Sequence, residues 1–225
     1  MTQDAISARD VLSRIPAVLR RLPAVAKGYY YYSVKKPNKP LSLGTLIERN
    51  AERFGARPAV MYEDRRYTYT EFNAWANRYA HFFRAQGLQK GDSIAIFLEN
   101  RPELLAVLSG AAKLGVACAM LNTSQKGRVL EHSINLIQPK MMVVGEEVHD
   151  AFDSVKEHIR FGHARPWLFL ADTDTTRNFG TAPEGYVNLA ESVSRYQGDN
   201  PTLTDPPRLG DTAIYLFTSG TTGLP

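Results

Sequence analysis

A cluster of hydroxyl and glycine residues follows an apolar run near the end of the 225-residue chain. Its members are Thr218, Ser219, Gly220, Thr221, Thr222 and Gly223. The glycines let the backbone turn its amides toward a ligand, and the hydroxyls supply further hydrogen-bond donors. A polyphosphate carries several anionic oxygens that need such donors. We therefore predict that these six residues bind phosphate groups.

Two other interpretations of this cluster have to be weighed. Its spacing differs from GxxxxGK[ST], and no lysine follows it in the chain, so it is not a P-loop of that type. A Ser/Thr/Gly run near a terminus is also typical of a flexible tail. The apolar residues 213–217 weigh against a tail, because ligands of open α/β sheets lie at the carboxyl ends of strands, and the residues by themselves leave both alternatives open.

The preceding residues supply a sheet that could position this loop. Short apolar runs alternate with helical patterns from residue 93 onward. Strands are expected at 93–98, 116–121, 141–144, 167–170 and 212–217, and helices at 102–114, 128–136 and 149–158. Residues 172–210 are expected to be mainly surface loop, with a short helix at 189–193. We predict an α/β fold with a mostly parallel sheet and helices on both faces.

A helical layer and a hairpin are expected before the sheet. Apolar residues at helical spacing predict a helix from residue 43 to residue 54, which Gly55 ends. Residues 59–62 and 67–69 are typical of two short strands joined by a charged turn. A third helix, capped by Thr70, is expected to bury one apolar face. That face comprises Phe72, Trp75, Ala76, Tyr79, Phe82 and Phe83.

The composition indicates a globular protein of the cytoplasm. Hydrophobic residues make up 44% of the chain and charged residues 22%, which is enough for a full core. Cys118 is the single cysteine, so no intramolecular disulfide can form, and we expect it to be a small buried residue. The apolar runs are too short to cross a bilayer, and the first residues do not resemble a secretory signal. The five histidines lack the spacing of a metal site, and surface or helix-cap roles are expected for them.

The net charge of +4 is concentrated in residues 1–40. They contain eight Lys or Arg and two Asp, whereas the rest of the chain holds 19 of the 27 basic residues and 21 of the 23 acidic ones. A basic groove across the domain is therefore not expected, and neither is a nucleic-acid partner.

Residues 1–40 are interpreted as a basic amphipathic arm and residues 41–225 as a domain. Apolar residues recur at helical spacing in the arm, with arginines elsewhere on the wheel, and four tyrosines follow at 29–32. Pro16 and Pro23 favour two or three short helices over one long helix. The arm either contacts an anionic membrane peripherally, at its inner face, or packs on its own domain, and the residues leave both alternatives open.

Several segments point to one known family. Residues 215–225, YLFTSGTTGLP, resemble the phosphate-binding signature of the adenylate-forming (AMP-binding) superfamily, which includes acyl-CoA synthetases and the adenylation domains of peptide synthetases. Residues 67–115 look like the N-terminal subdomain of that family. The residues most similar to long-chain and very-long-chain acyl-CoA synthetases of the fatty-acid-transport-protein type are 121–123, 128–136 and 141–147. The resemblance covers roughly residues 41–225.

The resemblance implies the N-terminal part of the family's large domain and a long-chain fatty-acid–CoA ligase (AMP-forming). Such an enzyme activates a fatty acid with ATP and Mg²⁺ to an acyl-adenylate, and then transfers the acyl group to coenzyme A, its co-substrate. The cluster 218–223 would hold the β- and γ-phosphates, with Ser219 and Thr221 as the foremost hydroxyl contacts.

The chain also departs from the family pattern. It stops before the position of the family's lysine and lacks the downstream acidic metal ligand, ribose-binding aspartate and small C-terminal domain. We therefore expect it to be a fragment that is inactive alone, with no assignable catalytic residue or metal ligand. Two alternatives remain, namely a ligase for another carboxylic acid and a non-catalytic nucleotide-binding or membrane-docking module.

Overall fold

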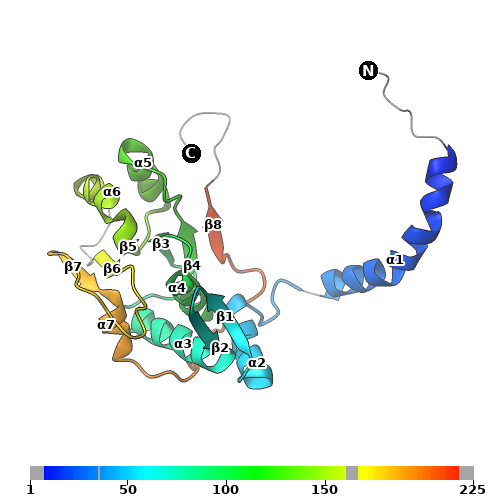
Figure 1. The fold of residues 1–225 in the computed structure, drawn as a ribbon, viewed down its shortest axis with the longest axis horizontal. Coiled ribbons are helices and arrows are strands. Elements are labelled where there is room, and N and C mark those ends of the chain that lie inside the picture. The colour runs from blue at the N-terminus through cyan, green and yellow to red at the C-terminus, as the bar shows by residue number, and fades with distance from the viewer. Residues whose placement is uncertain (1–7, 35, 161–166, 218–225) are drawn as a thin grey trace, which may run out of the picture.

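The computed structural model describes residues 8–34, 36–160 and 167–217. Figure 1 shows a layered α/β body and one long helix that extends away from it. The body is built on a six-stranded sheet in the order β7-β6-β5-β3-β4-β8, and all its strand pairs are parallel. The strands are β3 (Ser93–Phe97), β4 (Ala117–Met120), β5 (Met141–Gly145), β6 (Trp167–Leu170), β7 (Tyr186–Asn188) and β8 (Ile214–Leu216). The predicted α/β fold with a parallel sheet is confirmed.

Helices cover both faces of the sheet, as predicted. Side chains alternate along β3, so Ile94 and Ile96 enter one core while Ala95 and Phe97 enter the other. The first core packs against α3, α4 and α7, with α2 beside α3 and α4. The second packs against α5 and α6. These helices are α2 (Leu43–Phe54), α3 (Tyr69–Ala85), α4 (Pro102–Leu114), α5 (Gly127–Ile137), α6 (His149–Asp153) and α7 (Leu189–Ser194).

Helix α4 lies between α3 and the sheet and begins and ends at the predicted residues. Pro102 occupies its first turn, and Gly115 ends it in the left-handed region at φ 72°. Gly110 allows α3 to approach closely, because a Cβ at this position would lie 2.8 Å from the carbonyl oxygen of Ala76. The path of α4 is therefore fixed at its start, middle and end.

The hairpin before α3 is confirmed, but the predicted cap of α3 is wrong. Strands β1 (Pro58–Tyr62) and β2 (Arg65–Thr68) pair in antiparallel fashion across a turn at Glu63, where φ is 52°. Thr68 caps α3 in place of Thr70. Its hydroxyl accepts from the Glu71 amide, and the Glu71 carboxylate accepts from the Thr68 amide at 2.8 Å. This reciprocal pair is a capping box, in which Glu or Gln is typical three residues after the cap.

The N-terminal arm forms one helix, α1 (Ala8–Val34), and not the two or three short helices expected. Pro16 and Pro23 both lie inside it. Each removes one backbone hydrogen bond and favours bending, and the ribbon of α1 is bent in Figure 1. Within the described residues, no helix is long and apolar enough to span a membrane.

Two further elements differ from the sequence prediction. The helix expected at 149–158 is divided into α6 and a 3₁₀ turn at Lys156–His158. Between them, the Ser154 hydroxyl donates to the Ala151 carbonyl oxygen, a contact that competes with helix continuation. Strand β7 was not predicted, because its three residues are too few to show a period of two.

Candidate functional site

The strand order creates a crevice at the carboxyl ends of β3 and β4. The chain leaves β3 for α4 on one face of the sheet and leaves the neighbouring β4 for α5 on the other face. Adjacent strands whose connections diverge in this way leave a gap above their carboxyl ends, where ligands of open α/β sheets bind. Topology alone therefore marks this edge as the candidate site.

A pocket of about 400 Å³ occupies this crevice. It is lined by Leu98, Glu99, Asn100, Leu104, Met120, Leu121, Asn122 and Thr123. The Asn122 side chain accepts hydrogen bonds from the Ser124 amide at 2.9 Å and from its hydroxyl at 2.8 Å. Asn122 thus lines the pocket and also fixes the turn after β4.

The predicted phosphate loop follows a strand that ends beside this pocket. Strand β8 pairs with β4, with Leu216 opposite Met120. The carboxyl end of β8 therefore lies next to the pocket side of β4. The cluster Thr218, Ser219, Gly220, Thr221, Thr222 and Gly223 begins two residues after β8 but lies outside the described residues. Its role stays a prediction.

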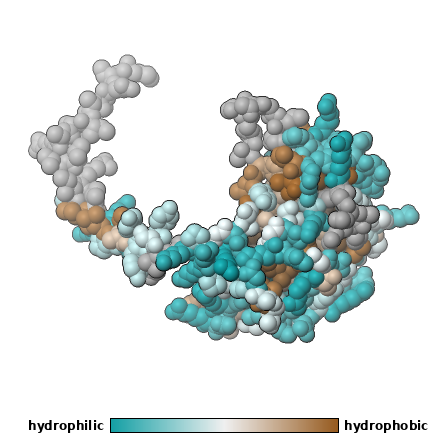
Figure 2. Space-filling view, turned by 180° about the vertical axis from the view of Figure 1, so that it is seen from behind, coloured by the Kyte–Doolittle hydropathy of each residue, from teal (hydrophilic) through white to brown (hydrophobic). Residues whose placement is uncertain are grey.

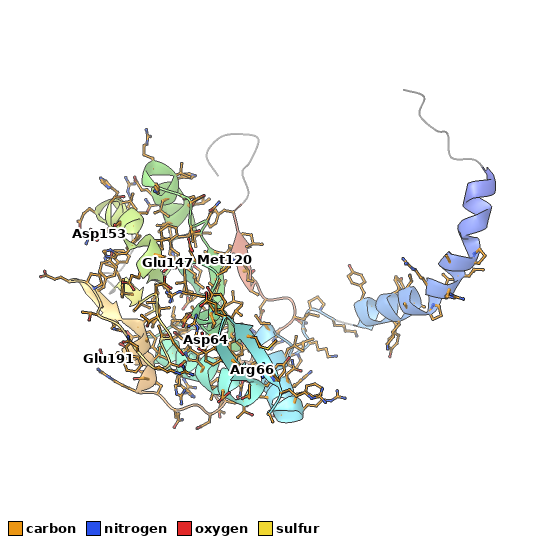
Figure 3. The ribbon with its side chains drawn as sticks, viewed as in Figure 1. Asp64, Arg66, Met120, Glu147, Asp153 and Glu191 are labelled. Carbon is orange, nitrogen blue, oxygen red and sulfur yellow. The ribbon has the colours of Figure 1, made fainter. Side chains whose placement is uncertain are left out.

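Charged residues surround the other side of the crevice. Arg101 follows β3 and is buried, with 5% of its surface exposed. Its guanidinium donates to the carbonyl oxygens of Leu170, at 3.1 Å, and of Ala171. It also lies 3.5 Å from a carboxylate oxygen of Glu147, whose other oxygen accepts from the Glu99 amide at 2.7 Å. In Figure 3, Glu147 and Met120 lie at the same end of the sheet.

A second ion pair attaches the hairpin to the start of α4. The Arg65 guanidinium donates to the fully buried Glu103 carboxylate at 2.8 Å. Burial alone would lower the pKa of Arg65, but the Glu103 charge raises it above its usual value. The Tyr67 hydroxyl donates to Asp174 at 3.1 Å, and burial together with the Asp174 charge raises the pKa of Tyr67. The hairpin therefore braces the helix that follows the crevice loop.

Other residues that could do chemistry, such as Cys118 and His81, have surroundings that indicate structural roles. Cys118 is 1% exposed in β4, and burial raises the pKa of its thiol to about 12, so the thiolate that nucleophilic attack requires is scarce. Among the described residues, no group of three or more His, Cys, Asp or Glu side chains could hold a metal ion. His81 was expected at the surface or at a cap, but it is buried in α3, with Nε2 2.9 Å from the Asp199 carbonyl oxygen.

Sequence analysis missed the charged side of the crevice. The signal was present, because charged residues stand two or three positions after three expected strands: Arg101 comes after the first, Glu147 after the third and Asp172 after the fourth. The carboxyl ends of parallel strands meet at one edge of a sheet, so these residues had to lie together once the topology was known.

Comparison with known proteins identifies the family. Residues 47–225 match the family model of AMP-binding enzymes, and the chain belongs to this family. The chain is 31% identical over 220 residues to the medium/long-chain-fatty-acid–CoA ligase FadD6 of Mycobacterium tuberculosis, a match that covers 96% of this chain and 33% of that protein. It is also 31% identical over 207 residues to human long-chain fatty acid transport protein 6, covering 85% of this chain and 30% of the relative. The chain thus spans about a third of the length of these relatives.

Solved structures confirm the fold. The anthranilate CoA ligase AuaEII, in complex with anthranoyl-AMP, has a TM-score of 0.72 at 20% identity, over 86% of this chain and 35% of that structure. A fatty acyl CoA synthetase of Mycobacterium tuberculosis has a TM-score of 0.65 at 23% identity, over 79% of this chain and 32% of that structure. The body therefore has the fold of the N-terminal domain of adenylate-forming enzymes.

Proposed function

We propose that the whole protein to which this chain belongs is an ATP-dependent long-chain fatty acyl-CoA ligase, and that residues 41–225 are the N-terminal part of its AMP-binding domain. The observation that carries the proposal is that β8, the strand just before the predicted phosphate-binding cluster 218–223, ends beside the crevice between β3 and β4. The similarity to FadD6, named as a medium/long-chain-fatty-acid–CoA ligase, supports a fatty acid as the substrate.

The proposed reaction has two steps. A carboxylate oxygen attacks the α-phosphorus of ATP, and pyrophosphate leaves as the acyl-adenylate forms. The thiol of coenzyme A then attacks the acyl carbon, losing its proton, and AMP leaves as the thioester forms. In this scheme the hydroxyls and backbone amides of residues 218–223 hold the β- and γ-phosphates and stabilise the charge of the departing pyrophosphate.

The described residues offer no site of their own for Mg²⁺. No cluster of three potential ligands is found among them. Of the carboxylates at the crevice, Glu147 is already engaged by the Glu99 amide and by Arg101. We propose that Mg²⁺ would accompany the nucleotide and neutralise phosphate charge.

Exchange of pyrophosphate into ATP, dependent on an added acid, tests the adenylation step on the natural protein. Fatty acids of graded length are expected to support exchange. Thr221→Val removes a predicted phosphate donor and should lower the exchange rate by about 10- to 100-fold. Ser194→Ala is the matched control, because the Ser194 hydroxyl only donates to the Glu191 carbonyl oxygen within α7. Absence of exchange with every fatty acid, from a folded protein, would contradict the proposal.

The same assay separates the two alternatives. Exchange with aromatic or small acids, but not with fatty acids, would indicate a ligase for another carboxylic acid. ATP binding without any exchange would indicate a non-catalytic nucleotide-binding module.

We further propose that residues 1–40 contact the inner face of a membrane peripherally in a cytoplasmic protein. Exposed apolar side chains on α1 support this proposal, since Leu19 is 56% and Val25 is 63% exposed. Figure 2 shows apolar side chains on the helix, well away from the body. Arg20 and Arg21 are exposed on the same helix and could face anionic lipid headgroups.

Sedimentation with vesicles of phosphatidylcholine and phosphatidylserine tests this contact. Binding is expected at low salt and should weaken as salt rises, because the attraction of the cations is screened. Leu19→Gln should reduce binding, whereas Leu136→Gln, at an exposed leucine of α5, should not. A chain that stays in the supernatant at low salt would contradict the membrane contact.

A further inference from the structure

Arg101 is a buried cation at the border of the candidate site. It directly precedes α4, and Glu99 and Asn100, the two residues before it, line the crevice pocket. Only 3% of its side chain is exposed. Burying a guanidinium is costly unless hydrogen-bond acceptors satisfy its donors. The positions of these acceptors therefore indicate the role of the buried cation.

The hydrogen-bond partners of Arg101 come from two other strand ends at one edge of the sheet, and the buried Glu103 carboxylate of α4 lies 3.8 Å from its guanidinium. Its own loop follows β3. The carbonyl oxygens of Leu170 and Ala171 stand at the end of β6, and Glu147 stands just after β5. Glu147 also contacts the loop after β3, because its carboxylate accepts a hydrogen bond from the Glu99 amide at 2.7 Å. One planar cation therefore joins the carboxyl-end loops of three strands.

We propose that Arg101 is a positioning residue that fixes the loops after β3, β5 and β6 relative to one another and so sets the shape of the crevice. Arginine suits this task because its planar fork can donate in several fixed directions, which the single ammonium of lysine cannot reproduce. The part of the inference that concerns catalysis rests on the proposed function. The part that concerns the loops does not.

Helix α4 contains a second buried cation that serves as an internal control. The Lys113 side chain is fully buried near the other end of the helix, where Nζ lies 2.7 Å from a carboxylate oxygen of Glu48 and 2.8 Å from Oδ1 of Asn73. Burial lowers the pKa of Lys113. Its partners belong to α2 and α3, so its loss should destabilise the helix layer without releasing the crevice loops.

Amide hydrogen exchange on the folded protein tests the positioning of the loops. Arg101→Lys should make the amide of Glu99 and those of the loops after β5 and β6 exchange at least about tenfold faster, because their shared partner is lost. Lys113→Met should leave the exchange rates of these amides unchanged, even where it lowers the free energy of unfolding as much as Arg101→Lys does. Glu147→Gln is a milder variant, in case Arg101→Lys fails to fold, and should accelerate exchange after β3 and β5.

Kinetics on the natural protein test the link to catalysis. Misplaced loops should raise KM for ATP by about tenfold or more in Arg101→Lys and change kcat less, whereas Lys113→Met should leave KM unchanged. Unchanged loop exchange in both Arg101→Lys and Glu147→Gln, or equal acceleration in Lys113→Met, would overturn the inference. A third outcome separates the two proposals. If the loop amides exchange faster in the variants but the wild type shows no ATP-dependent activity, the proposed function is refuted and the positioning role stands.

Discussion

At the scale of single residues, burial decides which side chains are chemically available. Arg101 and Cys118 both lie at or near the crevice strands, but their surroundings differ. Arg101 is buried among carbonyl and carboxylate oxygens that accept from its terminal nitrogens, whereas Cys118 is buried among apolar side chains of the first core. A thiol in such surroundings stays protonated at neutral pH.

Cys118 should therefore report on unfolding. Because burial raises the pKa of the thiol to about 12, labelling by a thiol reagent at pH 7 should be slow in the folded chain. The labelling rate should rise with denaturant in proportion to the population of the opened protein. Rapid labelling of the native chain, with unchanged circular dichroism, would show that β4 is accessible. Cys118→Ala gives the background of the assay.

At the scale of elements, the beginning of α3 depends on a charge. Hydrogen bonds from the Thr68 amide and hydroxyl lower the pKa of Glu71 below its usual value. A carboxylate with a lowered pKa stabilises the fold above its ordinary pKa, and this contribution is lost as the pH falls through the folded-state value. We expect Glu71→Gln to be less stable than the wild type at pH 7, and the difference to shrink toward pH 3.

Urea unfolding of both proteins across this range measures the difference. A gap between the two curves that stays constant with pH would show that the charge of Glu71 contributes nothing to the capping box. Thr68→Ser keeps the capping hydroxyl and is the control for the box itself.

Close packing of α3 on α4 gives a second prediction at this scale. Gly110→Ala places a methyl group 2.8 Å from the Ala76 carbonyl oxygen, so we expect a loss of about 1–3 kcal/mol in the free energy of unfolding. Gly28→Ala in α1 meets nothing within 4 Å and raises helix propensity, so it should not lower this free energy. Denaturant titrations of the two variants provide the comparison, and equal stability would mean that the two helices can separate at little cost.

The elements also show what the sequence can predict. Helix α4 matched its prediction because Pro102 and Gly115 mark its ends by local rules. The cap of α3 was predicted at the wrong threonine because Thr68 and Thr70 are both of a residue type that caps helices. Only the position of Glu71, three residues after Thr68, distinguishes the two. The crevice pocket and the Arg101 contacts depend on strand order, and strand order is set by long-range packing that no local pattern contains.

At the scale of the whole molecule, α1 and the body are distinct. The described side chains of α1 are exposed, whereas residues 36–40 belong to the body through backbone bonds. The carbonyl oxygens of Pro37 and Lys39 accept from the amides of Gly210 and Leu209, both at 2.9 Å. Residues 36–40 therefore contact the body, and the division of the chain at residue 40 stays a prediction.

Removal of residues 1–35 should consequently leave the body intact. We expect the midpoint of thermal unfolding to be unchanged within about 2 °C, because no apolar core residue of the body is lost. Differential scanning calorimetry of the two chains measures the shift. A fall of several degrees would mean that α1 packs on the body in solution.

The pairing of β8 with β4 has a consequence for synthesis on the ribosome. The central strands β3, β4 and β5 lie close together in sequence and can pair early, whereas β8 joins β4 only after residues 121–213 have been made. Of the described strands, β8 is thus the last to be made, and it precedes the cluster 218–223. If that cluster binds phosphate as proposed, the nascent chain can pair β3, β4 and β5 before it can hold a nucleotide, so ligand binding cannot assist these early steps of folding.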